Sequence, residues 1–133
     1  MTAALGAVPW TTVAAIGIGA AAGALARFAA GLWFNGLWRG FPLGTLLVNC
    51  VGGFLVGAAM VLFARHPDET LRHLAVTGFL GGLTTFSAFS GESLGLLQRG
   101  ELPMAAAHTL SHVLGALLCA SLGFLLARAA LRP

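Results

Sequence analysis

Polar and aromatic side chains interleave within residues 78–93, in a segment that is otherwise hydrophobic enough to lie in a bilayer. The segment contains the adjacent glycines Gly81 and Gly82, a series of hydroxyl side chains, and the carboxylate of Glu92. Backbone groups freed from a helix inside a membrane are costly unless protein, water or an ion satisfies them. A glycine-interrupted, hydroxyl-rich segment at this depth therefore predicts a permeation site or an ion-binding site.

Two phenylalanines within this segment offer a way to bind an anion. Phe86 and Phe89 are three residues apart, and the hydroxyl residues Ser87 and Ser90 follow each of them. Aromatic rings carry partial positive charge at their edges, so ring edges beside hydroxyl donors could coordinate a weakly hydrated anion. Packing in the core or against lipid is the alternative explanation for this spacing.

Two charged residues have two interpretations each. Glu92 is either a functional carboxylate within the membrane or an interfacial residue, because Arg99 and Glu101 follow soon after it. Arg27 either extends to the lipid headgroups or attracts anions into a vestibule.

Polar residues also occur in the hydrophobic stretches on either side. Thr45 and Asn49 are four residues apart and share a helix face. Asn49 either holds two helices together by a hydrogen bond or lines a polar pathway as a donor. His108 and His112 have the i, i+4 spacing of metal ligands, but the sequence places no third ligand beside them.

The composition indicates an integral membrane protein. Of the 133 residues, 58% are hydrophobic and only 8% are charged, whereas soluble domains contain about 25% charged residues. The basic residues are all arginine and form no run, so nucleic-acid binding is not predicted. Cys50 and Cys119 lie in apolar stretches and suit a packing role. No phosphate-binding loop, nucleophile motif or acid–base pair supports an enzyme.

The spacing of the charges predicts an all-α membrane protein with one domain, residues 1–133, and four transmembrane helices. The expected spans are about 10–34, 41–64, 73–98 and 103–127, and each is long enough to cross a bilayer. The third span contains the interrupted segment. Glycines four residues apart predict close helix contacts, at Gly19 and Gly23, Gly53 and Gly57, and Gly91 and Gly95.

The arginines do not favour one orientation in the membrane. Four lie on the side of the termini (Arg65, Arg72, Arg128 and Arg132), and three lie on the opposite side (Arg27, Arg39 and Arg99). A bias in arginine and lysine normally sets orientation. The near balance predicts that copies insert both ways and pair antiparallel.

Three motifs in order resemble those of the fluoride channels of the Fluc (CrcB) family. They are Gly-x-x-x-Gly-Ala-x-x-Arg at 19–27, Pro-x-Gly-Thr-x-x-x-Asn-x-x-Gly at 42–52, and Gly-Gly-x-Thr-Thr-Phe-Ser-x-Phe at 81–89. The resemblance covers nearly the whole chain. It implies an antiparallel, dual-topology homodimer with two pores in the bacterial plasma or inner membrane, which exports fluoride passively and so lowers its toxicity.

The resemblance also implies site residues. The expected fluoride pore consists of Asn49, Phe86, Phe89, Thr45, Ser87, Ser90, Glu92 and Ser111, with Arg27 in the vestibule. Backbone carbonyls of Gly81 and Thr84 from two subunits would bind one structural sodium ion. The family usually has a tyrosine early in the fourth helix, and this chain, which lacks tyrosine, has Ala107 or His108 at that position.

Two other functions fit the sequence less well. A four-helix exporter of the small multidrug type needs a carboxylate in its first helix, and there is no Asp or Glu between Met1 and Arg65. A membrane subunit without transport activity would leave the motif at 81–89 unexplained.

Overall fold

The computed structural model describes residues 8–132, and this part of the chain is helical without strands. The helices are α2 (Trp10–Phe34), α3 (Leu43–Arg65), α4 (Glu69–Arg72), the π-helix η1 (His73–Leu80), α5 (Gly81–Leu83), α6 (Phe86–Gln98) and α7 (Leu102–Ala130). Residues 1–7 and 133, which belong to the predicted domain of 1–133, lie outside the described part.

Four helical stretches are long and apolar enough to cross a membrane. They are α2, α3, the composite helix from Glu69 to Gln98, and α7. The shortest, α3, has 23 residues, which rise about 35 Å at 1.5 Å per residue, against about 30 Å of hydrocarbon. The prediction of an all-α, multi-pass membrane protein with four spans is confirmed.

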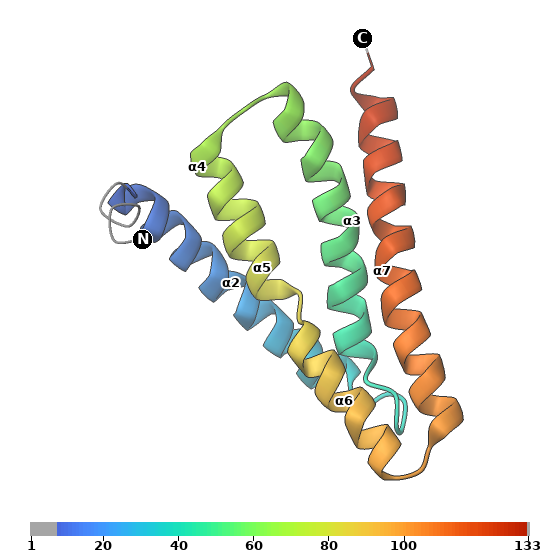
Figure 1. Ribbon diagram of the computed structural model, residues 1–133. Helices are drawn as coiled ribbons and strands as arrows, with labels where there is room; N and C mark the ends of the chain where they lie inside the picture. The colour runs from blue at the N-terminus through green and yellow to red at the C-terminus, as the bar shows by residue number, and fades with distance from the viewer. Residues whose placement is uncertain (1–7, 133) are drawn as a thin grey trace.

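The third span is broken, as predicted, but the break does not lie at the glycine pair. Gly81 and Gly82 are helical, and the extended residues are Thr84 (φ −79°, ψ 153°) and Thr85 (φ −150°, ψ 118°). Figure 1 shows this extended link between α5 and α6. Gly82 has a different role, because a Cβ added there would lie 3.0 Å from the Cα of Ala20 in α2.

Two of the three glycine pairs are contacts between helices. A Cβ on Gly53 would lie 2.7 Å from the carbonyl oxygen of Ala116. The helices α3 and α7, which lie side by side in Figure 1, therefore approach each other closely. A Cβ on Gly19 would lie 2.8 Å from the backbone nitrogen of Phe79, which brings α2 against η1. The third pair is different, since within the described chain nothing lies within 4 Å of a Cβ on Gly91.

The interior of a single chain is small. One cluster of buried apolar residues lies between the helices (Ala30, Val48, Leu80 and Leu83), while Trp10 is 87% exposed and Trp33 is 71% exposed. Lipid tails solvate such side chains as well as a protein core does, so close backbone packing, rather than burial, associates the helices.

Candidate functional site

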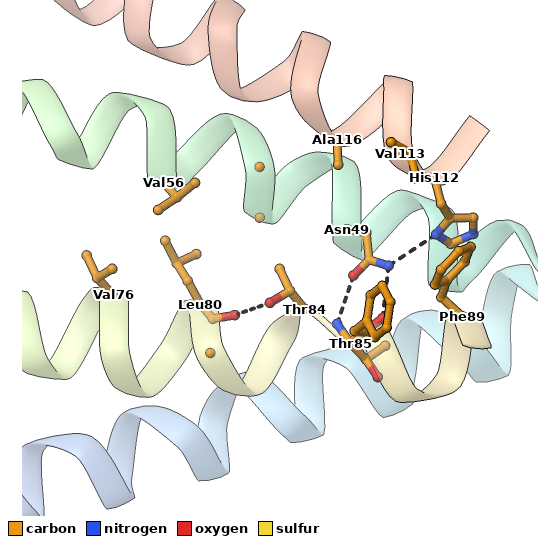
Figure 2. A pocket seen from close by; sticks show the side chains of 14 residues that line it. Asn49, Val56, Val76, Leu80, Thr84, Thr85, Phe89, His112, Val113 and Ala116 are labelled. Carbon is orange, nitrogen blue, oxygen red and sulfur yellow. Dashed lines mark hydrogen bonds between the residues drawn. The ribbon is translucent and has the colours of Figure 1, made fainter. Parts of the chain in front are cut away.

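The side chain of Asn49 in α3 holds the broken part of the third span (Figure 2). Its Oδ1 accepts a hydrogen bond from the backbone nitrogen of Thr85 at 2.8 Å. Its Nδ2 donates to the carbonyl oxygen of Thr85 at 3.1 Å and to Nδ1 of His112 at 3.2 Å. One amide therefore replaces the backbone acceptor that the Thr85 nitrogen would have in a continuous helix, and joins three helices.

The break redirects two backbone donors, those of Thr85 and Ala88. In a continuous helix the nitrogen of Thr85 would donate to the Gly81 carbonyl, and that of Ala88 would donate to the Thr84 carbonyl. The Thr85 nitrogen instead donates to Asn49, and the Ala88 nitrogen donates to Oγ1 of Thr85 at 3.1 Å. Thr85 is thus the N-cap of α6, and the Gly81 and Thr84 carbonyls lose their i+4 donors.

Phe86 and Phe89 have different surroundings. Their ring centroids are 5.3 Å apart, but Phe86 is 78% exposed and Phe89 is 8% exposed. Both line a cavity of about 510 Å³ together with Asn49, Thr85 and His112. The site therefore places one ring in the interior and leaves the other on the outer face of a single chain.

A line of polar contacts continues from Phe89 toward the other end of α6. Oγ1 of Thr45 donates to Oε1 of Glu92 at 2.6 Å, and Oε2 of Glu92 lies 3.3 Å from Nε2 of His108. Nδ1 of His108 is 2.9 Å from Oγ of Ser93. Thr45 and His108 therefore contact the two oxygens of Glu92, whose side chain is 24% exposed.

The two histidines pack on Phe89. Their ring centroids are 4.4 Å apart, and the centroid of Phe89 lies 5.6 Å from His108 and 4.8 Å from His112. The third candidate ligand that the sequence could not place is Glu92. One ligand atom from each of these residues lies within 4.8 Å of the others, so the group could bind a metal ion.

Arg27 and Glu92 line the same cavity of about 280 Å³, which also contains Asn35 and Thr45. Asn35 was not anticipated from the sequence. Its Oδ1 accepts hydrogen bonds from the backbone nitrogens of Gly44 at 2.7 Å and Thr45 at 3.2 Å, so it caps the start of α3. A lone asparagine in a short loop carries no signal that would have revealed this role.

The three serines are not equivalent. Oγ of Ser87 lies 3.3 Å from Oγ1 of Thr85, next to the break. Oγ of Ser90 donates to the Phe86 carbonyl within its own helix, at 2.8 Å. None of the contacts described above involves Ser111, and the neighbouring His112 meets both Asn49 and Phe89.

The fourth-helix position that the family gives to tyrosine has two candidates in this chain. Ala107 is exposed, whereas His108 is fully buried and stacks on Phe89.

The fold and the site together define a multi-pass membrane protein with buried polar side chains beside a broken helix. The family model described as "CrcB-like protein, Camphor Resistance (CrcB)" matches residues 14–124. The chain belongs to this family.

Individual relatives cover most of the chain. It is 50% identical over 116 residues to a protein of Pseudomonas aeruginosa (strain UCBPP-PA14), with 86% of this chain and 91% of the relative covered. It is 48% identical over 117 residues to a protein of Bordetella petrii, with 86% and 90% covered. It is 44% identical over 119 residues to one of Pectobacterium carotovorum, with 88% and 94% covered. All three are named fluoride-specific ion channel FluC.

Proposed function

We propose that this protein is a fluoride-selective channel of the bacterial inner membrane, through which cytoplasmic fluoride leaves by passive electrodiffusion. The observation that carries the proposal is the polar line beside Phe89, where Asn49 joins the broken helix and Thr45 and Glu92 continue toward the end of the bundle. The relatives covering most of the chain are named as channels for this ion and not as enzymes.

A pathway for a small anion must replace hydration with donors of partial positive charge. The proposed pathway uses the Arg27 cavity as its vestibule, and then the hydroxyls of Thr45, Ser87 and Ser90. At the phenylalanines, ring edges supply the positive partial charge. Both amide donors of Asn49 already bind Thr85 and His112. Asn49 therefore contributes by keeping the helix broken at Thr85. Ser111 remains a proposed lining residue whose contact depends on the assembly.

The functional unit of the proposal is an antiparallel homodimer. Phe86 is 78% exposed in a single chain, and an aromatic pore residue on an outer face needs a covering surface. Within the described residues, no other segment of the chain comes within 4 Å of a Cβ built on Gly91. Four arginines against three give no preferred orientation. A second copy inserted the other way up would satisfy all three observations.

A structural sodium ion belongs to the same proposal. The Gly81 and Thr84 carbonyls lose their helical donors at the break, and unwound carbonyls coordinate sodium in other membrane proteins. Two carbonyls from each of two chains would give four oxygen ligands. Bound there, sodium would supply the positive charge that holds the two breaks together.

Fluoride efflux from liposomes containing the purified protein tests the proposed function. We expect efflux when a potassium ionophore dissipates the membrane potential, and much slower release of chloride under the same conditions. Equal rates for the two halides, or release no faster than from protein-free liposomes, would contradict the proposal.

A further inference from the structure

Three titratable side chains from two helices meet beside the break. Glu92 comes from α6, and His108 and His112 come from successive turns of α7. His108 is fully buried, and His112 is 4% exposed. One ligand atom of each residue lies within 4.8 Å of the others.

Each side chain has one atom bound by a neighbouring polar residue, and of the remaining atoms Oε2 of Glu92 and Nε2 of His108 contact each other at 3.3 Å. Thr45 binds one oxygen of Glu92, Ser93 contacts Nδ1 of His108, and Asn49 contacts Nδ1 of His112. Among the described residues no hydrogen-bond partner exists for Oε2 of Glu92, Nε2 of His108 or Nε2 of His112. A buried polar group without a hydrogen bond costs about 1–3 kcal/mol, so three such atoms in one cluster of residues favour a shared ligand.

We propose that Glu92, His108 and His112 form a binding site for one divalent transition-metal ion, such as Zn²⁺, in each chain. Two imidazoles and one carboxylate are a common set of zinc ligands that leaves a fourth position open. Bonds of about 2.0–2.1 Å in a tetrahedral site place ligand atoms about 3.3 Å apart. Oε2 of Glu92 and Nε2 of His108 are already 3.3 Å apart.

The neighbouring charges set how strongly the site binds. The Glu92 carboxylate attracts a dication, whereas Arg27 and Arg99 line the two cavities that border Glu92. Both guanidinium groups repel a dication near Glu92, which lowers the affinity of the site. The site therefore suits a regulatory ion better than a permanently bound one.

Metal binding to His112 competes with the hydrogen bonds through which Asn49 fixes Thr85 at the break. Nδ2 of Asn49 is a donor, so Nδ1 of His112 accepts, and the neutral ring carries its proton on Nε2. A metal on Nε2 moves this proton to Nδ1, where it faces the amide donor. The amide could turn its acceptor Oδ1 toward this proton, but it would then lose the hydrogen bond that Oδ1 accepts from the backbone nitrogen of Thr85.

Two consequences follow for transport, and both rest on the proposed function. Release of Thr85 loosens the start of α6, next to Phe89. The open position on the metal binds fluoride, a hard anion, and retains it. Occupancy of the site therefore slows fluoride passage.

Zinc binding to the tag-free dimer in detergent tests the inference directly. The experiment uses a Cys50→Ala/Cys119→Ala background, so that thiols do not contribute. We expect saturable binding of one Zn²⁺ per chain, and tetrahedral d–d absorption bands when Co²⁺ replaces it. Removing a ligand in His112→Gln or Glu92→Gln should weaken binding at least ~100-fold, more than the loss of a supporting contact would. Asn49→Ala should bind Zn²⁺ more tightly, because it removes the competing contact.

The matched control removes the histidines outside the cluster. His73 lies 3.7 Å from Glu69 in a similar i, i+4 pair near the membrane surface. His66→Gln/His73→Gln should therefore leave the affinity unchanged. Binding that survives in His112→Gln, or the absence of tetrahedral bands in the parent protein, would overturn the inference even if some variants fold poorly.

Efflux measurements separate this inference from the proposed function. With the parent protein in liposomes, Zn²⁺ should slow fluoride release, and Glu92→Gln should need at least ~10-fold more Zn²⁺ for the same inhibition of its remaining flux. Fluoride release without zinc binding would overturn the metal site alone. Zinc binding without fluoride release would overturn the proposed function alone.

Discussion

At the scale of single residues, the side chains of the proposed pathway differ in what they already bind. Asn49 uses its oxygen and both amide hydrogens on Thr85 and His112. Its role therefore combines polarity with a structural task that no other polar residue in the described part of α3 shares. Phe86 is exposed whereas Phe89 is buried, so a substitution of Phe89 should disturb packing as well as the proposed pathway.

The variant Asn49→Asp tests whether transport needs the amide donors of Asn49, which bind Thr85 and His112. An aspartate keeps the acceptor for Thr85 but loses the donors, and it places a negative charge beside the path of an anion. Two charges about 4 Å apart repel by about 4 kcal/mol at an effective dielectric constant of 20. We expect fluoride efflux to fall at least ~100-fold, since each 1.36 kcal/mol of barrier is tenfold in rate, while size exclusion still detects the dimer. Parental efflux at neutral pH would place Asn49 off the pathway.

The variants Phe86→Ile and Phe89→Ile separate ring chemistry from packing. Isoleucine fills space but has no positive edge, and aromatic geometry contributes about 0.5–1.5 kcal/mol. Phe86→Ile should lower efflux roughly tenfold with an unchanged dimer yield. Phe89→Ile should lower efflux at least as much and also reduce the yield, because Phe89 packs on two imidazoles. Parental efflux in both variants would remove the rings from the pathway.

At the scale of elements, specific side-chain hydrogen bonds form the break in the third span; residues that merely tolerate extended backbone do not account for it. A π-helical stretch, the short helix α5 and two extended threonines precede α6. The hydroxyl of Thr85 restarts the helix by accepting from the backbone of Ala88. The break therefore depends on one side chain from each of two helices, Asn49 and Thr85.

Thr85→Val tests this cap with little change in shape. Loss of an N-cap oxygen typically costs about 1 kcal/mol, and here it also leaves the Ala88 nitrogen without its acceptor within the membrane. We expect a lower melting temperature and slower efflux. Thr84→Val is the matched control, because the Thr84 hydroxyl only donates to Leu80 in the preceding turn. A larger effect in Thr84→Val than in Thr85→Val would contradict this assignment.

At the scale of the whole molecule, a single chain leaves surfaces uncovered that an assembly would bury. Its interior is small, and Phe86 and the glycine at position 91 face outward. Two antiparallel copies would cover these surfaces and bring two breaks together.

Orientation is measured by labelling a single cysteine appended at the C-terminus, with Cys50 and Cys119 replaced. An impermeant thiol reagent should reach it from both sides of the membrane, because the arginines are nearly balanced. Several lysines added to the connection between α3 and α4, residues 66–68, should impose one orientation and reduce efflux. Co-expression of an oppositely biased copy should restore it. Labelling from one side only in the parent protein would contradict dual topology.

Removal of sodium tests the proposed structural ion. Because the ion would join two subunits, replacing sodium by a large organic cation should lower the stability of the dimer and the efflux rate together. A sodium gradient should not drive fluoride movement, since the proposed ion would lie between the pores. Stoichiometric coupling of fluoride to sodium would contradict both the structural ion and the channel.

The amino-acid sequence by itself determined the membrane class, the four spans and the interrupted third span, because hydrophobic length and sparse charge are local properties. It also identified Asn49, Phe89 and Glu92 as chemically unusual. It misplaced the break, since the acceptor that terminates α5 belongs to a residue 36 positions away in α3. Only the tertiary structure brought Glu92 to His108 and His112, and Asn35 to the start of α3. Contacts between distant segments depend on how the helices pack, and spacing along one helix does not encode that packing.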